Sequence, residues 1–465
     1  MKSVINLIIL FVLVVFSGNA QERPNIVYIN IDDLGWTDLA CYGSTYYETP
    51  NIDQLVSRGM MFTDAYASAS NCAPSRAGLM SGQYSPRYGI YTVGTSERGR
   101  SKDRKLIPVK NNTTLPDSIV TLAEVLKNAG YITASMGKWH LGDDPKTQGF
   151  DINVGGTHAG HPKSYFSPYR NKNLKDGPVG EYLTDRLTKE GISFIRTHKD
   201  EAFFLYMTYY TVHTPLQGKK EIIQKYKNKP VSESHNNATY AAMVETMDTN
   251  VGRLIKILEE LDLIKNTLII FTSDNGGLQT VSKQTPLKYG KGSYYEGGTR
   301  VPLIVRWDGR IKPKTVSKTP VINLDFYPTL LEISNISPEK DQILDGKSLV
   351  PVLFDQKELE QRPLFWHFPV YLEAGKGFDE LTGRDVLFRT RPGSAMRYGK
   401  WKLHQYFEDG AVELYDLEND ITEKHDLSKN KPEITTALLK ILDTWREEVN
   451  APVPEELNPD YIHPD

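Results

Sequence analysis

Short apolar runs alternate with amphipathic helical patterns along most of the chain, and this alternation limits the possible folds more than any other feature. Most of the runs are rich in β-branched or aromatic residues and lack strict polar–apolar alternation, as central strands covered on both faces do. They lie at residues 24–31, 131–136, 202–210, 267–273 and 301–307. Apolar residues at helical spacing lie between them at 118–130, 182–198 and 238–264. The pattern predicts an α/β fold with a mostly parallel or mixed central sheet between helical layers.

The pattern changes near residue 355. Residues 394–407 and 411–417 look like antiparallel strands, and residues 433–449 look like a closing helix. A chain of 465 residues is long for one hydrophobic core. We therefore expect a catalytic domain at 21–354 and a smaller C-terminal α+β subdomain at 355–465, built from antiparallel strands and a helix.

The first twenty residues have the features of a signal peptide. Lys2 supplies a positive charge, residues 5–16 are apolar, and small residues precede a cleavage point after Ala20. The apolar run is short for a membrane span. We expect an exported protein, periplasmic or secreted after cleavage, without stable membrane insertion. The net charge of -3 gives no broad positive field and argues against a nucleic-acid partner.

Two pairs of residues with side-chain oxygen donors follow predicted strands. Asp32 and Asp33 come after the first strand, and Asp274 and Asn275 come after the run at 267–273. Ligands of open α/β sheets bind beyond the carboxyl ends of the strands. Carboxylate and amide oxygens are hard donors, so the two pairs predict a site for Ca²⁺ or Mg²⁺ and not for a soft metal. Each pair alone is also compatible with a solvated turn.

Basic and titratable side chains follow the other strands. Lys138 and His140 come after the run at 131–136, and His213 comes after the run at 202–210. Arg76 and Lys288 add positive charge if their segments reach the same edge of the sheet. Such a group suits a tetrahedral oxyanion ester, with cations on the nonbridging oxygens and histidines for proton transfer. Each residue alone is also compatible with an ordinary surface role.

Cys72 is one of only two cysteines, the other being Cys41. The sequence after it predicts a helix start, with Pro74 in the first turn. A helix N-terminus favours negative charge, so Cys72 is a candidate thiolate nucleophile. A buried structural thiol and a disulfide with Cys41 fit the residues as well, and the residues alone leave these three alternatives open.

The stretch Cys-Ala-Pro-Ser-Arg at 72–76 resembles the C-x-P-S-R signature of type I, formylglycine-dependent sulfatases, which belong to the alkaline phosphatase-like superfamily. Further similar motifs occur in the family's order: RPNIVYINIDDLGWTDLACYG, GYITASMGKWHLG, SDNGG and KGSYYEGGTRVPLIVRWDG. RYGKWKL and ELYDLENDITEKHDL resemble the family's small C-terminal domain. The resemblance covers nearly all of the chain after residue 20 and implies a sulfuric ester hydrolase similar to polysaccharide-active bacterial arylsulfatases.

The resemblance also implies a modified residue and a metal site. Cys72 would be oxidised to Cα-formylglycine by a formylglycine-generating maturation enzyme. The modified side chain would complete a Ca²⁺ site with Asp32, Asp33, Asp274 and Asn275.

The resemblance further implies the catalytic roles. Arg76 and Lys138 would stabilise the hydrated aldehyde, and His140 would act as the base when sulfate is released. His213 and Lys288 would hold the sulfate group and protonate the departing sugar oxygen. The motif around the last of these residues, TPLKYGKG, offers a second lysine at position 291.

The sugar pocket is less defined. The segment 155–177 predicts a long loop, and we expect His158 and His161 to lie near the mouth of the pocket. Arg389 and Arg391 are candidates to bind a carboxylate or a second sulfate. A structured surface loop and a solvated basic turn are the respective alternatives. The family points to a sulfated polysaccharide or its oligosaccharides, of the algal galactan, ulvan or glycosaminoglycan type.

Two other functions fit the same pattern. A phosphatase or phosphonate monoester hydrolase of the same superfamily would cleave phosphorus esters faster than sulfate esters. A catalytically silent protein that binds sulfated glycans would retain an unmodified Cys72.

Overall fold

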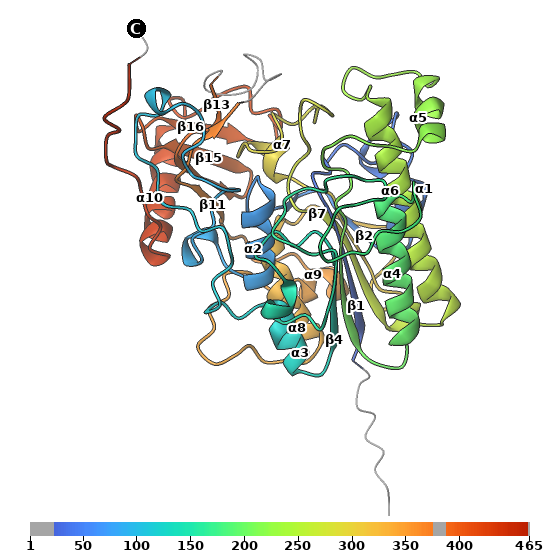
Figure 1. The fold of residues 1–465 in the computed structure, drawn as a ribbon. Coiled ribbons are helices and arrows are strands. Elements are labelled where there is room, and N and C mark those ends of the chain that lie inside the picture. The colour runs from blue at the N-terminus through green and yellow to red at the C-terminus, as the bar shows by residue number, and fades with distance from the viewer. Residues whose placement is uncertain (1–22, 375–386, 464–465) are drawn as a thin grey trace, which may run out of the picture.

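The structure is a computed structural model and describes residues 23–374 and 387–463. The expected signal peptide at residues 1–20 lies outside these ranges. Within them, the main sheet has eight strands and runs through the centre of the larger part of the molecule (Figure 1). In spatial order the strands are β5 (Ile152–Val154), β4 (Ile132–Gly137), β6 (Phe203–Thr208), β1 (Asn25–Ile31), β7 (Thr267–Ser273), β8 (Leu303–Arg306), β2 (Met60–Phe62) and β9 (Thr315–Ser317).

The sheet is mixed, as predicted. Strands β5, β4, β6, β1 and β7 are parallel neighbours, whereas β8 runs antiparallel to both β7 and β2. All five predicted strands are present, and their ends agree with the predictions to within two residues. The sequence did not reveal β2, β5 and β9, because strands of three residues are too short to show a period.

Helices cover both faces of the sheet, so its central strands are buried on both sides (Figure 1). Val27, Ile29 and Ile31 of β1 pack in one apolar core, and Ile26 and Tyr28 pack in another on the opposite face. The first core contains α1 (Pro50–Arg58), α4 (Leu183–Thr197), α5 (Lys220–Lys227) and α6 (Ala238–Glu260). The second contains α2 (Cys72–Ser81), α3 (Leu122–Asn128), α8 (Phe326–Ile333) and α9 (Val350–Asp355).

The C-terminal region forms the predicted antiparallel sheet with a closing helix. Its strands, in spatial order, are β11 (Leu364–Phe368), β14 (Gly393–Tyr398), β15 (Trp401–Tyr406) and β16 (Val412–Asp416). Helix α10 (Pro432–Glu448) packs on this sheet through Leu438, Leu442 and Trp445. Two pairs of short strands lie outside these sheets, one within each part: β3 (Ala65–Tyr66) with β10 (Val321–Ile322) in the larger part, and β12 (Leu372–Glu373) with β13 (Phe388–Thr390) in the C-terminal region. The boundary at residue 354 stays a prediction.

Buried charges join the C-terminal sheet to the main domain. The Lys402 ammonium on β15 lies 2.7 Å from a Glu296 carboxylate oxygen, and both side chains are fully buried. Glu296 begins the short helix α7 (Glu296–Thr299) and also accepts a hydrogen bond from Arg300 at 2.7 Å. Burial alone would raise the pKa of Glu296, but Lys402 and Arg300 hold it well below its usual range. The carboxylate therefore stays charged between the two parts of the chain.

In the two described ranges, no helix is long and apolar enough to span a membrane.

Lys402→Met should destabilise the protein because it removes one partner of a buried ion pair. We expect the free energy of unfolding to fall by about 3 kcal/mol, measured by urea denaturation. Lys400→Met is the matched control, since Lys400 lies two residues away in the same hairpin and makes a half-exposed pair with Asp416. The control should unfold like the wild type. Equal effects of the two substitutions would contradict this account of the interface.

Candidate active site

The two pairs of oxygen-donor residues, Asp32–Asp33 and Asp274–Asn275, meet at the carboxyl edge of the sheet because β1 and β7 are adjacent parallel strands. Ile31 pairs with Ser273 at the ends of these strands, so the residues that follow each strand are neighbours. The Asn275 side-chain amide donates a hydrogen bond to Asp33 at 2.8 Å, and the Asp33 backbone N–H donates to Asp274 at 3.2 Å. Asp33 has a positive φ of 61°, a conformation that short polar side chains tolerate best.

Each buried carboxylate is paired with a cation from a different part of the chain. The Lys138 ammonium lies 2.7 Å from Asp32, and both side chains are completely buried. The other pairs are Arg76 with Asp274 at 2.8 Å and Lys291 with Asp33 at 2.7 Å. Three elements that are distant in sequence therefore converge on the two strand ends.

The end of β4 approaches β6 closely enough to require glycine. A Cβ atom on Gly137 would lie 1.9 Å from the carbonyl oxygen of Thr208, and Gly137 has a φ of 108°. The next residue, Lys138, donates its backbone N–H to the same carbonyl at 2.8 Å. This close approach of the two strands places the Lys138 side chain at the carboxyl edge of the sheet, where its ammonium donates to Asp32.

The carboxyl groups of Asp32 and Asp33 differ in pKa because the neighbouring cations act on them unequally. Burial raises the pKa of Asp32 to about 7, and the carboxylates of Asp274 and Asp33 add to this rise against the opposing charge of Lys138. Burial would also raise the pKa of Asp33, but Lys291 and His213 outweigh it and hold this pKa well below the usual range. Of these two neighbouring carboxyl groups, Asp32 is therefore the harder to ionise.

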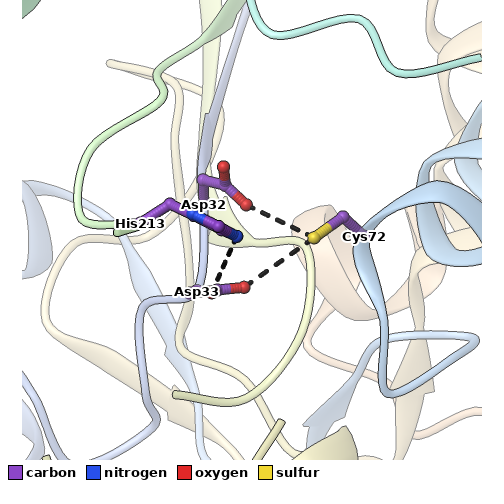
Figure 2. A group of neighbouring side chains, drawn as sticks. All are labelled: Asp32, Asp33, Cys72 and His213. Carbon is purple, nitrogen blue, oxygen red and sulfur yellow. Dashed lines mark hydrogen bonds and ion pairs between the residues drawn. The ribbon is translucent and has the colours of Figure 1, made fainter. Parts of the chain in front are cut away.

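Cys72, the first residue of α2, faces Asp32 and Asp33 from one side of this group (Figure 2). Its Sγ atom is 3.6 Å from Asp32, 3.8 Å from Asp33 and 3.3 Å from the Lys291 ammonium. Both Cys72 and Cys41 are free, which rules out the disulfide alternative. Burial raises the pKa of the Cys72 thiol to about 12, so an unmodified Cys72 is a protonated thiol and not the thiolate considered from the sequence.

His213 faces the same group from the other side (Figure 2). Its Nε2 atom is 3.5 Å from Asp33, and its Nδ1 atom is 2.7 Å from the carbonyl oxygen of Thr214. Because a carbonyl oxygen only accepts, Nδ1 carries the proton and Nε2 is the basic nitrogen of the neutral ring. Burial and the charge of Lys291 lower the pKa of His213 to about 3. Four residues, Asp32, Asp33, Cys72 and His213, present potential metal-ligand atoms within 4.8 Å of one another.

His140 is the second histidine at this edge. Like Asp33, it has a positive φ, of 66°, and its backbone N–H donates to Thr157 at 2.9 Å. Burial and the charge of Lys138 lower the pKa of His140 well below its usual range. Its Nδ1 atom is buried and makes no hydrogen bond to any of the described residues. The structure therefore presents a neutral ring with an available nitrogen.

Lys288 does not reach this group, and the prediction that placed it there is wrong about its position. Its ammonium donates to the carbonyl oxygen of Glu423 at 3.0 Å and lies 4.0 Å from the ring centre of Tyr295. Lys291 lies where Lys288 was expected. Tyr289, which lies between the two lysines, has a positive φ of 62° that bends the segment, and the two lysine side chains diverge. A sequence shows both lysines but not the direction of this bend.

The structure places the two loop histidines beside His140 and His213. The ring of His158 is 6.2 Å from that of His140. The ring of His161 stacks on His213 at 6.1 Å, with 11° between the planes. Both histidines therefore lie at the edge of the site, and their contact with substrate stays a prediction.

The two candidate arginines differ in position. Arg389 on β13 donates to the carbonyl oxygen of Lys291 at 3.4 Å, so it lies beside the site. Burial and repulsion from Arg98 lower the pKa of Arg389 to about 10. Arg391 forms a 2.7 Å ion pair with Glu408, which already compensates its charge. A substrate contact of either arginine stays a prediction.

A mixed sheet with an acidic and cationic pocket at its carboxyl edge is the architecture of the alkaline phosphatase-like hydrolases. The chain belongs to the sulfatase family of this superfamily, because the profile of the family "Sulfatase" matches residues 24–336. A second profile, "N-sulphoglucosamine sulphohydrolase, C-terminal", matches residues 288–448. The protein is thus a sulfuric ester hydrolase.

Similarities to named sulfatases support this family assignment. The chain is 34% identical to a sulfatase of Formosa agariphila, over 93% of this chain and 90% of that protein. It is 31% identical to the human N-acetylgalactosamine-6-sulfatase, over 76% of this chain and 69% of that protein. The crystal structure of Ps i-CgsB in complex with k-i-k-neocarrahexaose matches with a TM-score of 0.75 at 32% identity, over 91% and 93% of the two chains.

Lys291→Ala should lower kcat/KM for a sulfate ester by about 100-fold or more, because it removes a cation from the pocket in which we expect the sulfate ester to bind. Lys288→Ala is the matched control, since this lysine binds Glu423 outside the pocket. Its kcat/KM should fall far less. Steady-state sulfate release, with thermal unfolding to confirm that both variants are folded, measures the difference. A larger loss of kcat/KM in the Lys288 variant would show that Lys288, and not Lys291, serves the pocket.

Proposed function

We propose that this protein is an exported sulfatase that removes sulfate from a sulfated polysaccharide or its oligosaccharides, using Cα-formylglycine made from Cys72. The position of Cys72 carries the proposal: it begins α2, and its side chain contacts Asp32, Asp33 and Lys291 in a buried polar pocket. Relatives named for N-acetylgalactosamine sulfate and a solved complex with a neocarrahexaose support a glycan substrate.

The donor set at the strand ends fits a hard divalent cation. Asp32, Asp33 and Asp274 supply carboxylate oxygens, and the side-chain oxygen of Asn275 is buried with no hydrogen-bond partner in the described part of the chain. An unpartnered buried oxygen among carboxylates is what a bound cation would satisfy. A site made of oxygen ligands favours Ca²⁺ over softer metals, and the ion would neutralise charge on the sulfate ester.

A formyl group at position 72 would supply, in its hydrated form, one hydroxyl to attack sulfur and a second to release sulfate. The residues around it are arranged to serve that group. The Lys291 ammonium already contacts the atom attached to Cβ of residue 72. Arg76 is anchored on Asp274, while its Nη2 atom is buried with no partner among the described residues. This free donor and Lys138 give the pocket positive charge for an attacking oxygen.

The two histidines serve the two proton transfers. The Nδ1–H of His213 is held by Thr214, which aims Nε2 at the pocket. A bound sulfate ester is an anion, so its approach favours the protonated ring and lets Nε2 protonate the leaving sugar oxygen. His140 is neutral and has an unpartnered nitrogen, as suits the base that assists release of sulfate.

The apolar segment near the N-terminus supports export to the periplasm or the medium. In this proposal a maturation enzyme oxidises Cys72. The proposal also divides the chain into a catalytic domain at residues 21–354 and a C-terminal subdomain at residues 355–465.

The structure of a phosphonate monoester hydrolase of Agrobacterium radiobacter shares the fold at 19% identity, with a TM-score of 0.68. A desulfation screen over defined sulfated mono- and oligosaccharides, with the phosphate esters of the same sugars, separates the two activities. We expect faster release of sulfate. Faster release of phosphate would overturn the assignment.

Cys72→Ala should abolish sulfate release, because alanine has no group that can be converted to an aldehyde. Cys41→Ala is the control, since Cys41 is half-buried and lies outside the pocket. It should keep wild-type activity. Peptide mass spectrometry of the active wild type should find formylglycine at position 72. A turnover rate in the Cys72 variant equal to that of the wild type would refute its role as nucleophile.

Ca²⁺ should raise the thermal unfolding midpoint of the wild type, because an ion that binds only the folded state stabilises it. Asn275→Ala should reduce this rise by removing a ligand. The exposed Asn228, at the end of α5, gives the control variant Asn228→Ala, which should respond like the wild type. Differential scanning calorimetry with and without a chelator measures the shifts. An unchanged response in the Asn275 variant would exclude Asn275 as a ligand.

A further inference from the structure

A cavity of about 260 Å³ lies directly beside the proposed sulfate site. Two of its lining residues, His158 and His161, are the histidines whose rings lie next to those of His140 and His213. Tyr210 lines it too, and its carbonyl oxygen accepts the backbone N–H of His213 at 3.0 Å. A sugar whose sulfate ester occupies the reaction site would therefore extend into this cavity.

The cavity carries an excess of positive charge. Lys163, Arg170 and Lys172 line it, and among the described lining residues Asp143 is the only carboxylate. Asp143 pairs with Lys172 at 3.2 Å, but both side chains are largely exposed, so the pair is weak. Three cations face one carboxylate here, whereas the whole chain has a net charge of -3. The excess is local and lies where substrate would enter.

The turn that carries Arg170 and Lys172 is fixed to the segment that carries His158. The Asn171 side chain donates to the carbonyl oxygen of Gly155 at 2.9 Å, and the Gly155 N–H donates to Asn173 at 2.9 Å. The Asn173 side chain donates to Gly156 at 2.6 Å. These bonds hold the basic turn in place before any ligand binds, which lowers the entropy cost of binding.

We infer that this cavity binds a second anionic group of the same substrate, so that the enzyme acts on glycans with two neighbouring negative charges. The inference rests on the proposed function. A second sulfate and a uronic-acid carboxylate have the required chemistry, since both accept bidentate hydrogen bonds from arginine and a charge contact from lysine. A singly sulfated sugar leaves the three cations unused.

The test measures kcat and KM of the modified wild-type enzyme on three kinds of substrate. The first is a monosulfated sugar, either galactose or N-acetylgalactosamine, according to which of the two the enzyme desulfates. The second is the disulfated form of the same sugar. The third is the monosulfated sugar linked to a uronic acid. We expect KM for at least one of the two dianionic substrates to be about tenfold lower than for the monosulfated sugar. The substrate with the lower KM identifies the second group as sulfate or carboxylate. Equal KM values for all three would overturn the inference.

Variants assign the effect to the cavity. Arg170→Ala and Lys172→Ala should each raise KM for the preferred dianionic substrate about five- to tenfold, with kcat unchanged and the monosulfated sugar unaffected. Lys175→Ala is the control, because Lys175 is exposed in the same loop but does not line the cavity. Added salt should raise KM of the wild type for the dianionic substrate more than for the monosulfated one, since exposed charges are screened.

Two failures are distinguishable. If the modified wild type releases no sulfate from any of the three substrates, the proposed function is wrong, and this inference falls with it. If sulfate is released but the Arg170 and Lys172 variants behave like the Lys175 variant, the enzyme is a sulfatase and only the second anion site is refuted.

Discussion

Charge compensation at the carboxyl edge of the sheet is the constraint on which the rest of this structure depends. Three carboxylates are buried within a few ångströms of one another, and ionised carboxylates cannot share such a space without cations. The pairs are Asp32 with Lys138, Asp33 with Lys291, and Asp274 with Arg76. Each cation comes from a different element, so the site forms only when α2, the end of β4 and the loop before α7 have all reached their places.

The loop that carries Lys291 ties the site to the C-terminal sheet. Lys288, at one end of the loop, binds Glu423 of the C-terminal region, and Arg389 on β13 contacts the carbonyl oxygen of Lys291. Beyond the loop, Glu296 pairs with Lys402 of β15 at zero exposure. The C-terminal region thus positions a cation of the pocket, although it contributes none of the buried carboxylates at the strand ends.

Sequence reasoning succeeded where one strong pattern decides the structure. The buried strands show as apolar runs, and the polar residues after them show which edge of the sheet holds the chemistry. It failed where geometry within a turn decides. An apolar run gives no strand direction, so the sequence did not show that β8 is the strand that runs antiparallel to β7. The choice between Lys288 and Lys291 depends on the bend of the backbone at Tyr289, and the protonation of Cys72 depends on burial that only the fold creates.

Every residue of α2 is buried, including Cys72 at 2% exposure and Arg76 at 1%. In the proposed maturation, the enzyme that oxidises Cys72 must reach this residue and those that follow it, and the folded protein does not expose them. Modification and folding would then compete, and oxidation would have to come first. A molecule that folded before oxidation would keep a protonated thiol in the pocket until it unfolded again. The yield of active enzyme would then depend on timing during synthesis as well as on the stability of the finished fold.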